Sequence, residues 1–195
     1  GLSDDALMAR LGRPGVAPEG RFYPDTYSYA KNSSDLKVLA RALKAMDKQL
    51  AKAWAARAPG VALKSPEDAL TLASIVEKET GKSSDRAMIA SVFHNRLRIG
   101  MLLQTDPTVI YGLGESFDGN LKRGHLRADT PWNTYTRAGL PPTPIAMPGK
   151  AALMAAVQPA SSQALYFVAR GDGSSQFSAS LDEHNRAVNR YQRGQ

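Results

Sequence analysis

Two glutamates, Glu77 and Glu79, follow an apolar segment at residues 69–76 and are separated by a single lysine. A carboxyl group at the edge of a buried surface loses hydration, which raises its pKa and lets it hold a proton near neutral pH. Such a group can act as a general acid toward a leaving group. The structural alternative for both glutamates is a solvated charge at a helix end.

The segment that carries the glutamates is predicted to be one helix. Ser65 can cap its N-terminus, Pro66 suits the first turn, and Asp68 adds an acidic side chain there. At about 100° per residue, the buried stripe of this helix comprises Ala69, Leu72, Ala73, Val76 and Thr80. Glu77 and Glu79 lie on opposite edges of this stripe, with Glu79 nearer its centre. The projection therefore favours Glu79 as the acid and leaves Glu77 as the alternative.

The remaining pattern predicts a mainly helical α+β fold with a small antiparallel β-sheet. Apolar spacing and helix-capping residues predict further helices at about residues 4–11, 35–57, 85–99, 150–157 and 181–191. Residues 164–178 are predicted to form a β-hairpin, with a turn at Gly171 to Gly173. The aromatic segment 21–29 is predicted to be an edge strand or an extended loop that packs on the next helix.

The connections around the glutamates carry two further predictions. The short turn after Gly81 predicts that helices 65–80 and 85–99 pack antiparallel, with Ser83 or Ser84 capping the second. Residues 100–149 are loop-like, because Pro, Gly, Thr, Asp and Asn are frequent there. A long irregular segment on a helical base commonly forms a binding cleft.

Composition narrows the chemistry. The 195 residues carry a net charge of +7 and no cysteine, so thiol chemistry and disulfides are excluded. The three histidines are far apart in sequence, and neither a metal site nor a cofactor motif is evident. The charge fits an acidic partner, but the basic residues are scattered, which does not favour nucleic acid. No apolar run is long enough to span a membrane. Carboxyl acid–base chemistry remains, and it suits cleavage of a glycosidic bond.

Several segments of the chain, in the same order, resemble the YceG-like endolytic murein transglycosylases, the MltG family. They are residues 19–27, 73–80, 91–97, 103–111, Tyr135, 139–142 and 165–168. The resemblance implies an enzyme that cleaves the MurNAc–GlcNAc β-1,4 bond within glycan strands without water. The products carry 1,6-anhydroMurNAc ends, and the reaction terminates or trims nascent strands.

The resemblance also implies an organisation and a location. Residues 19–195 would be the catalytic domain, and residues 1–18 a remnant of a preceding LysM-like subdomain or linker. Family members are held in the bacterial inner membrane by one N-terminal helix, which this chain lacks, and they face the periplasm. Their partners are peptidoglycan glycan strands and the peptidoglycan synthases of the elongation machinery, with no nucleic acid and no cofactor.

Site residues follow from the family motifs. The catalytic glutamate lies in residues 77–80, and we expect it to be Glu79, with Glu77 as the alternative and the Thr80 hydroxyl helping to position the site. The residues expected to bind substrate are Gln104, Thr105, Asp106, Asn133, Tyr135 and Asn95. No metal ligand is expected.

Two other functions fit the same residues. A glycan hydrolase would use Asp106 as a second carboxylate that activates water, and it would leave reducing ends. A non-catalytic peptidoglycan-binding or scaffold module would bind glycan without turnover, with both glutamates merely solvated.

Overall fold

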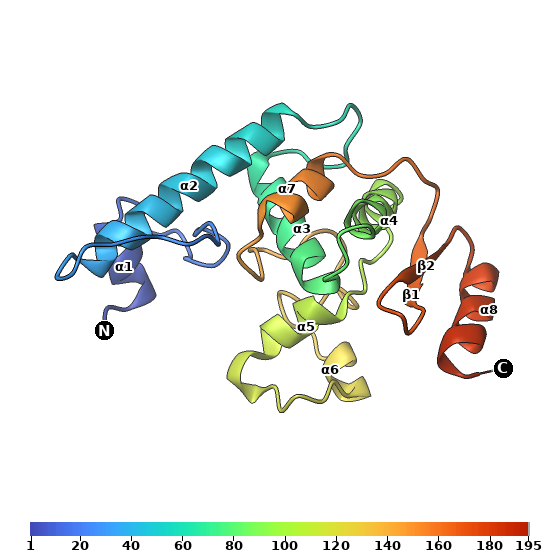
Figure 1. Ribbon diagram of the computed structural model, residues 1–195. Coiled ribbons are helices and arrows are strands. Elements are labelled where there is room, and N and C mark those ends of the chain that lie inside the picture. Colours follow the sequence, from blue (N-terminus) through green and yellow to red (C-terminus); the bar gives the residue numbers. More distant parts are fainter. Residues whose placement is uncertain (195) are drawn as a thin grey trace.

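Helix α3 (Pro66–Glu79) is the central element of the computed structural model, which describes residues 1–194 (Figure 1). Its residues from Ala69 to Val76 are all buried, and α2, α4, α5 and α7 pack around it. Ser65 caps the helix, because its hydroxyl accepts a hydrogen bond from the Asp68 amide at 3.1 Å. The predicted start of this helix is therefore confirmed. The helix ends at Glu79, so both glutamates occupy its last turn.

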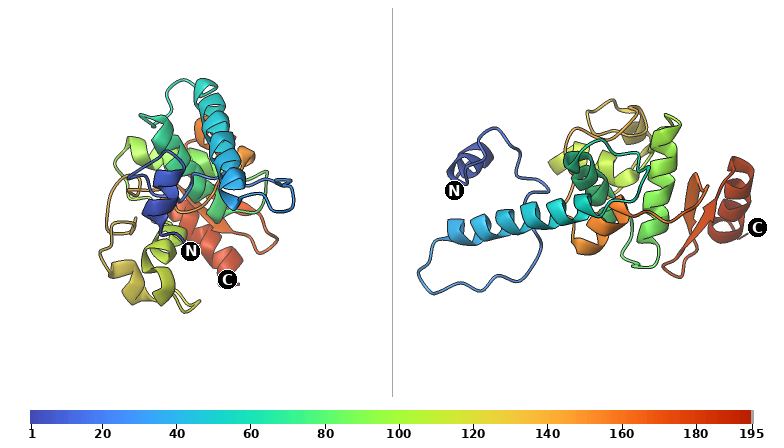
Figure 2. Two further views of the ribbon diagram at one scale, coloured as in Figure 1. Left: turned by 90° about the vertical axis from the view of Figure 1, so that its left-hand side faces the viewer. Right: turned by 90° about the horizontal axis from the view of Figure 1, so that it is seen from above.

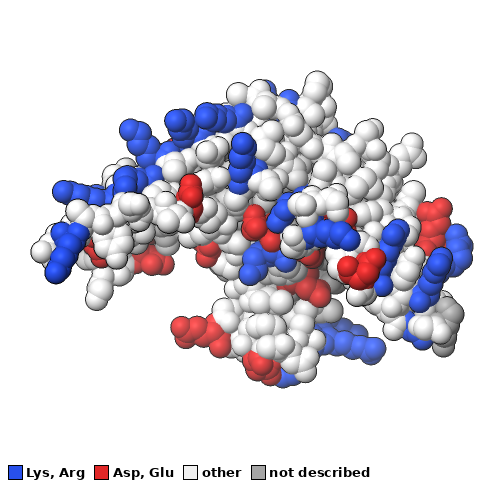
Figure 3. Space-filling model, in the orientation of Figure 1, with Lys and Arg blue, Asp and Glu red and all other residues white. Residues whose placement is uncertain are grey.

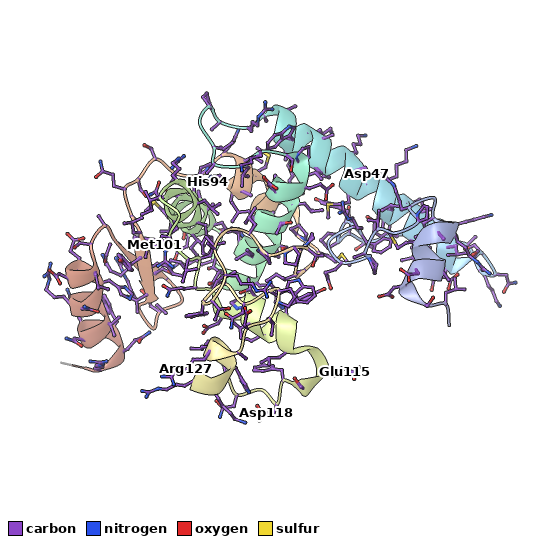
Figure 4. All side chains as sticks on the ribbon, turned by 180° about the vertical axis from the view of Figure 1, so that it is seen from behind. Asp47, His94, Met101, Glu115, Asp118 and Arg127 are labelled. Carbon is purple, nitrogen blue, oxygen red and sulfur yellow. The ribbon has the colours of Figure 1, made fainter. Side chains whose placement is uncertain are left out.

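Helices precede and follow α3 as the apolar spacing predicts. They are α1 (Asp4–Arg10), α2 (Asp35–Ala55), α4 (Arg86–Arg98) and α7 (Lys150–Val157). Helix α2 is long and extends to one side of the molecule (Figure 1). The segment after α1 is tied to α2 by an ion pair of Arg13 with Asp47 at 2.6 Å, and Figure 4 labels Asp47 on the helix. No helix within residues 1–194 combines the length and the apolar character needed to cross a membrane.

The predicted antiparallel packing of α3 and α4 is wrong. Figure 1 shows α4 along its axis while α3 lies across the view, and the view from above shows the reverse (Figure 2), so the helices cross steeply. The predicted serine cap of α4 is also wrong. Asp85 is its N-cap residue, and the Asp85 carboxylate accepts a hydrogen bond from the Ser175 amide at 2.7 Å instead of capping the helix. Tertiary contact with the hairpin thus replaces the local cap.

His94 fixes α4 against α7 (Figure 4). Its imidazole is completely buried, with Nε2 2.8 Å from the carbonyl of Ala156 and Nδ1 accepting from the Ala62 amide at 3.0 Å. Because Nδ1 accepts, Nε2 carries the proton and donates it to the carbonyl. Burial lowers the pKa of His94, so the ring stays neutral and structural.

Residues 100–149 are less irregular than their composition suggests. They contain α5 (Asp106–Leu113), the short 3₁₀ helix η1 (Gly114–Ser116) and α6 (Arg123–Arg127). The helices η1 and α6 are too short to show a repeated apolar spacing, and α5 contains Pro107 and Gly112, which usually mark turns. Thr105 precedes α5 as its N-cap residue but makes no side-chain capping bond. The prediction that residues 100–149 are loop-like is therefore wrong for these three short helices and holds for the rest of the segment.

The C-terminal region forms a separate small layer. Strands β1 (Tyr166–Ala169) and β2 (Ser175–Ser178) pair antiparallel, with Phe167 opposite Phe177. Helix α8 (Leu181–Gln192) packs on this hairpin, and Ser180 with Glu183 forms the capping box at its start. The hairpin and the mainly helical α+β class are confirmed. Residues 21–29 form no strand, and the Tyr23 amide bonds the Ala42 carbonyl of α2 at 3.1 Å.

Candidate active site

A cleft of about 500 Å³ lies where the end of α3 and the start of α5 face β1 and α8. The residues that line the cleft come from the middle and from the C-terminal part of the sequence. They are Glu79, Arg96, Gln104, Asp106, Tyr135, Tyr166, Phe167, Val168, Ala169, Leu181, His184, Val188 and Gln192. The side formed by α3, residues 104–108 and residues 133–135 is called the inner wall. The side formed by β1 and α8 is called the outer wall.

Glu79 projects into the cleft from the last residue of α3. Burial raises the pKa of its carboxyl group, and the negative charge of Asp106 adds to that rise. A hydrogen bond from Thr105 and the positive charge of Arg96 act in the opposite direction, but burial dominates. The carboxyl group can therefore hold a proton closer to neutral pH than an ordinary glutamate, as a general acid requires.

A network of three buried threonines holds the hydroxyl that contacts Glu79. Thr105 Oγ1 donates to Glu79 Oε1 at 2.7 Å, and the Thr105 amide donates to Thr134 Oγ1 at 3.1 Å. Thr108 Oγ1 donates to the Thr105 carbonyl and lies 2.8 Å from Thr134 Oγ1. The Thr108 hydroxyl has one proton and donates it to the Thr105 carbonyl. The Thr134 hydroxyl must therefore donate its own proton to the Thr108 oxygen. Each hydroxyl proton in the network then has one acceptor, which fixes the orientation of Thr105.

Arg96 connects the two walls of the cleft. Its guanidinium group is buried, and Nε donates to the Leu165 carbonyl at 2.7 Å while Nη1 donates to the Leu103 carbonyl at 2.7 Å. It also lies over the Tyr166 ring, 5.4 Å from the centroid. Within residues 1–194, Arg96 forms no ion pair with Glu79, so its charge favours the carboxylate without neutralising it.

Asp106 and Tyr135 form a second polar group in the cleft. The Tyr135 hydroxyl donates to Asp106 Oδ1 at 2.6 Å. Burial raises the pKa of Tyr135, and the bond to Asp106 raises it further, so the phenol keeps its proton and remains a donor. Gln104 lies beside this pair with a positive φ of 49°, an uncommon backbone conformation for a residue other than glycine.

The expected binding residues divide between the cleft and its support. Gln104, Asp106 and Tyr135 line the cleft, whereas Thr105 lies behind Glu79. Asn133 is completely buried, and its side chain donates to the carbonyls of three residues at 125–128 and accepts from the Tyr135 amide. Asn95 donates to the carbonyls of residues 162 and 164, both at 2.9 Å. The two asparagines are thus placed outside the cleft, where they hold backbone.

Glu77 and Thr80 also lie away from the cleft. Glu77 Oε2 accepts from the Gly149 amide at 2.9 Å, at the N-terminus of α7. Thr80 Oγ1 accepts from the Lys82 amide at 3.0 Å. The hydroxyl beside Glu79 therefore comes from Thr105, 26 residues along the chain, and not from its sequence neighbour.

The outer wall was not foreseen from sequence. Tyr166 stacks on His184, with ring centroids 5.2 Å apart, and Leu181 and Val188 extend the wall. Nothing local in the sequence marks α8 as facing Glu79, about a hundred residues earlier. Arg96 lies in segment 91–97, which resembles the transglycosylase family, and only this resemblance could have identified Arg96 as a residue of the site. Among the residues that the structure describes, no cluster of His, Asp or Glu could hold a metal ion.

Known proteins resemble this chain in sequence and in fold. The model of the YceG-like family matches residues 3–190. An endolytic murein transglycosylase of Bacillus subtilis is 37% identical over 89% of this chain and 48% of its own length. One from Streptococcus pneumoniae is 32% identical over 87% of this chain and 31% of its own length. The crystal structure of a YceG-like protein from Listeria monocytogenes, 41% identical, superposes with a TM-score of 0.74.

These matches cover nearly all of this chain but only part of the relatives. The Listeria structure covers 86% of this chain, which corresponds to 54% of that protein. The chain thus spans about half or less of the length of the relatives described here. Because the family model matches almost the whole chain, the chain belongs to the YceG-like family.

Proposed function

We propose that this chain is the catalytic part of an endolytic peptidoglycan lytic transglycosylase. One observation carries the proposal: a partly buried carboxyl group, Glu79, faces a cleft and is held by a hydrogen bond from Thr105. Relatives that bear the name endolytic murein transglycosylase align over most of the chain, and they supply the substrate class.

The proposed reaction needs a single acid. Protonated Glu79 gives its proton to the oxygen that bridges N-acetylmuramate and N-acetylglucosamine, and the bond from this oxygen to C1 of the muramyl sugar breaks. The Glu79 carboxylate then takes the proton of the C6 hydroxyl of the same sugar, and that oxygen closes onto C1. The products are a free 4-hydroxyl group and a 1,6-anhydro end, and no water is consumed.

Other residues of the cleft support these two steps. Thr105 occupies Oε1 of Glu79, which leaves Oε2 to carry the transferred proton. Arg96 stabilises the carboxylate that forms after the first transfer, since its charge favours the ionised state. Asp106 presents negative charge toward the oxocarbenium-like sugar, while Tyr135 orients Asp106 and Gln104 contacts the N-acetyl groups.

The place of action follows from the family resemblance. We infer that the whole protein is anchored in the inner membrane by one N-terminal helix outside this chain and works in the periplasm beside peptidoglycan synthases. Residues 19–195 would form the catalytic domain, and residues 1–18 would belong to a preceding LysM-like subdomain or linker.

The test is the mass of the glycan ends. Purified peptidoglycan is incubated with the chain, with Glu79→Gln and with the matched control Glu77→Gln, and the released fragments are analysed by mass spectrometry. We expect anhydro ends with the wild type and with Glu77→Gln, and a loss of about a thousand-fold or more with Glu79→Gln. Anhydro ends that persist in Glu79→Gln would exclude this assignment.

The same spectra separate the two alternative functions. Ends heavier by one water indicate a hydrolase, and their loss in Asp106→Asn would identify the second carboxylate. Saturable glycan binding without new ends, unchanged in Glu79→Gln, would indicate a binding or scaffold module.

A further inference from the structure

Five cations form a single row along the solvent side of α2. They are Lys37, Arg41, Lys44, Lys48 and Lys52, and all five are exposed (Figure 3). Successive members are four, three, four and four residues apart, which places them within a band of about 80° around the helix axis. The buried residues of α2, among them Met46 and Leu50, lie on the opposite side. We call these five residues the α2 cation row.

The charge of this row is not compensated by its own helix. Besides the row, α2 carries only two charged residues, Asp35 in its first turn and Asp47. Asp47 pairs with Arg13. Within residues 1–194 no member of the row takes part in an ion pair. A line of unpaired cations over about 22 Å therefore faces solvent.

An exposed aromatic ring lies in the loop that contacts Arg41 of the row. Arg41 Nη2 donates to the Ser28 carbonyl at 2.5 Å, and its guanidinium lies over the Tyr27 ring at 5.8 Å from the centroid. These contacts hold the preceding loop against the N-terminal half of the row. The next residue, Tyr29, is 74% exposed, one of the few large hydrophobic side chains that reach solvent. Tyrosine is enriched where proteins meet the headgroup region of a bilayer.

We propose that the α2 cation row, with Tyr29, is a docking surface for a bilayer that contains anionic lipid headgroups. Charge complementarity supplies the attraction, since lysines and arginines near an anionic bilayer each add to binding. A row of cations along the exposed side of one helix fits a flat surface, whereas single-stranded nucleic acid is bound in basic grooves with several stacking rings.

Docking in this way leaves the cleft accessible. The row follows the outer edge of α2, while the cleft is formed by the end of α3, α5, β1 and α8 on the opposite side of the molecule (Figures 1 and 3). Bound through this row, the domain would rest on the bilayer with its cleft turned away from the lipid. The proposal does not depend on the reaction at Glu79.

The test compares two triple variants with equal charge. Lys44→Glu/Lys48→Glu/Lys52→Glu reverses the row, and Lys64→Glu/Lys82→Glu/Lys150→Glu reverses three exposed lysines elsewhere. Each lowers the net charge from +7 to +1. Co-flotation is measured with vesicles of phosphatidylcholine alone and with about 30% phosphatidylglycerol, at low and at high salt. If circular dichroism shows that the row variant is unfolded, Lys44→Gln/Lys48→Gln/Lys52→Gln replaces it in the same measurements.

We expect the wild type to bind anionic vesicles at least about ten-fold better than neutral ones, with the preference lost at high salt. The row variant should lose about ten-fold and the control variant less than about two-fold. Tyr29→Ala should weaken vesicle binding but not binding to inorganic polyphosphate. Equal losses in both triple variants, no lipid preference, or equally tight binding of polyphosphate or an oligonucleotide would overturn the proposal.

Discussion

The inner and outer walls of the cleft are held by different kinds of contact. The inner wall is held by one directional hydrogen-bond network, which joins Glu79 to the buried residues Thr105, Thr108 and Thr134. On the outer wall, ring stacking of Tyr166 on His184 and apolar side chains predominate. The Nδ1 atom of His184 is buried without a partner within the described residues.

This difference suggests a division of labour. A proton transfer needs the acid held within a few tenths of an ångström, and directional bonds provide that precision. In the proposed polymeric substrate, sugar faces and stem peptides vary in position, and stacking or apolar contacts tolerate such variation because they have no strict geometry. The outer wall packs on the rest of the domain mainly through β1 and α4 and through the bond of Arg96 to the Leu165 carbonyl, whereas α3 is surrounded by α2, α4, α5 and α7.

After Glu79 itself, the largest effect is expected for Thr105 on the inner wall. Thr105→Val removes the hydroxyl that favours the Glu79 carboxylate, so the pKa of Glu79 should rise further. In the proposed mechanism Glu79 starts protonated, so kcat/KM falls as the pH rises through this pKa, and the falling limb should move to higher pH in the variant. The maximal rate should drop about 10- to 100-fold, since the acid is weaker and less well oriented. Kinetics of glycan cleavage across pH check both effects.

Thr105→Ser is the matched control, because it keeps the hydroxyl and should restore both the rate and the pH profile to near wild-type values. A Val variant that loses rate with an unmoved pH limb would mean that Thr105 serves only in packing. A substrate-binding role for Thr105 would instead raise KM and leave the limb in place.

Apolar spacing and capping residues anticipated the inner wall only where its determinants are local, and the family motifs supplied Gln104, Asp106 and Tyr135. The start of α3 and the side of the helix that Glu79 faces follow from Ser65, Pro66 and the apolar spacing. The partner of Glu79 does not, because Thr105 reaches it through a tertiary contact over 26 residues. Asn133 shows a second limit. An asparagine that bonds a sugar and one that bonds backbone carbonyls are the same residue type in a sequence.

The sequence predicts the hairpin and the helix that form the outer wall, but it does not predict that they line the cleft. Ser180 and Glu183 mark the start of α8, and the apolar run at 164–169 followed by the turn at Gly171 to Gly173 marks the hairpin. Their position opposite Glu79 depends on long-range contacts, such as that of Arg96 with the Leu165 carbonyl. Helix α5 was missed because Pro107 and Gly112 lie within its eight residues, and both residue types usually mark turns.

The second prediction concerns the side of α3 that faces away from the cleft. Glu77→Ala removes the acceptor of the Gly149 amide at the N-terminus of α7. Loss of this bond should lower the free energy of unfolding by about 1–2 kcal/mol, as measured in urea. Cleavage activity should stay within about three-fold, because Glu77 does not line the cleft. A thousand-fold loss of activity without a loss of stability would return Glu77 to the catalytic role.

The third prediction tests whether the outer wall opens independently. Ser180→Ala breaks the capping box of α8 and should weaken this helix by about 1 kcal/mol. Native-state hydrogen exchange of α8 amides should then accelerate about five-fold, while the amides of α3 remain unchanged. Equal acceleration in α3 would show that the two walls unfold together, which would contradict the comparison.

The smallest effect tests the burial of Glu79 without any substrate. Its pKa is raised in the folded state, so the stability that this group contributes is present below the pKa of the unfolded chain and is lost as the pH rises through the folded value. Glu79→Gln does not titrate, so its melting temperature should exceed that of the wild type by about 1–3 °C at pH 7 and by nothing near pH 4. Glu77→Gln keeps an acceptor for Gly149 and should show no gain at pH 7. A Glu79→Gln gain that persists at pH 4 cannot come from the cost of a buried charge, and the acid would then lack the environment on which the inner wall depends.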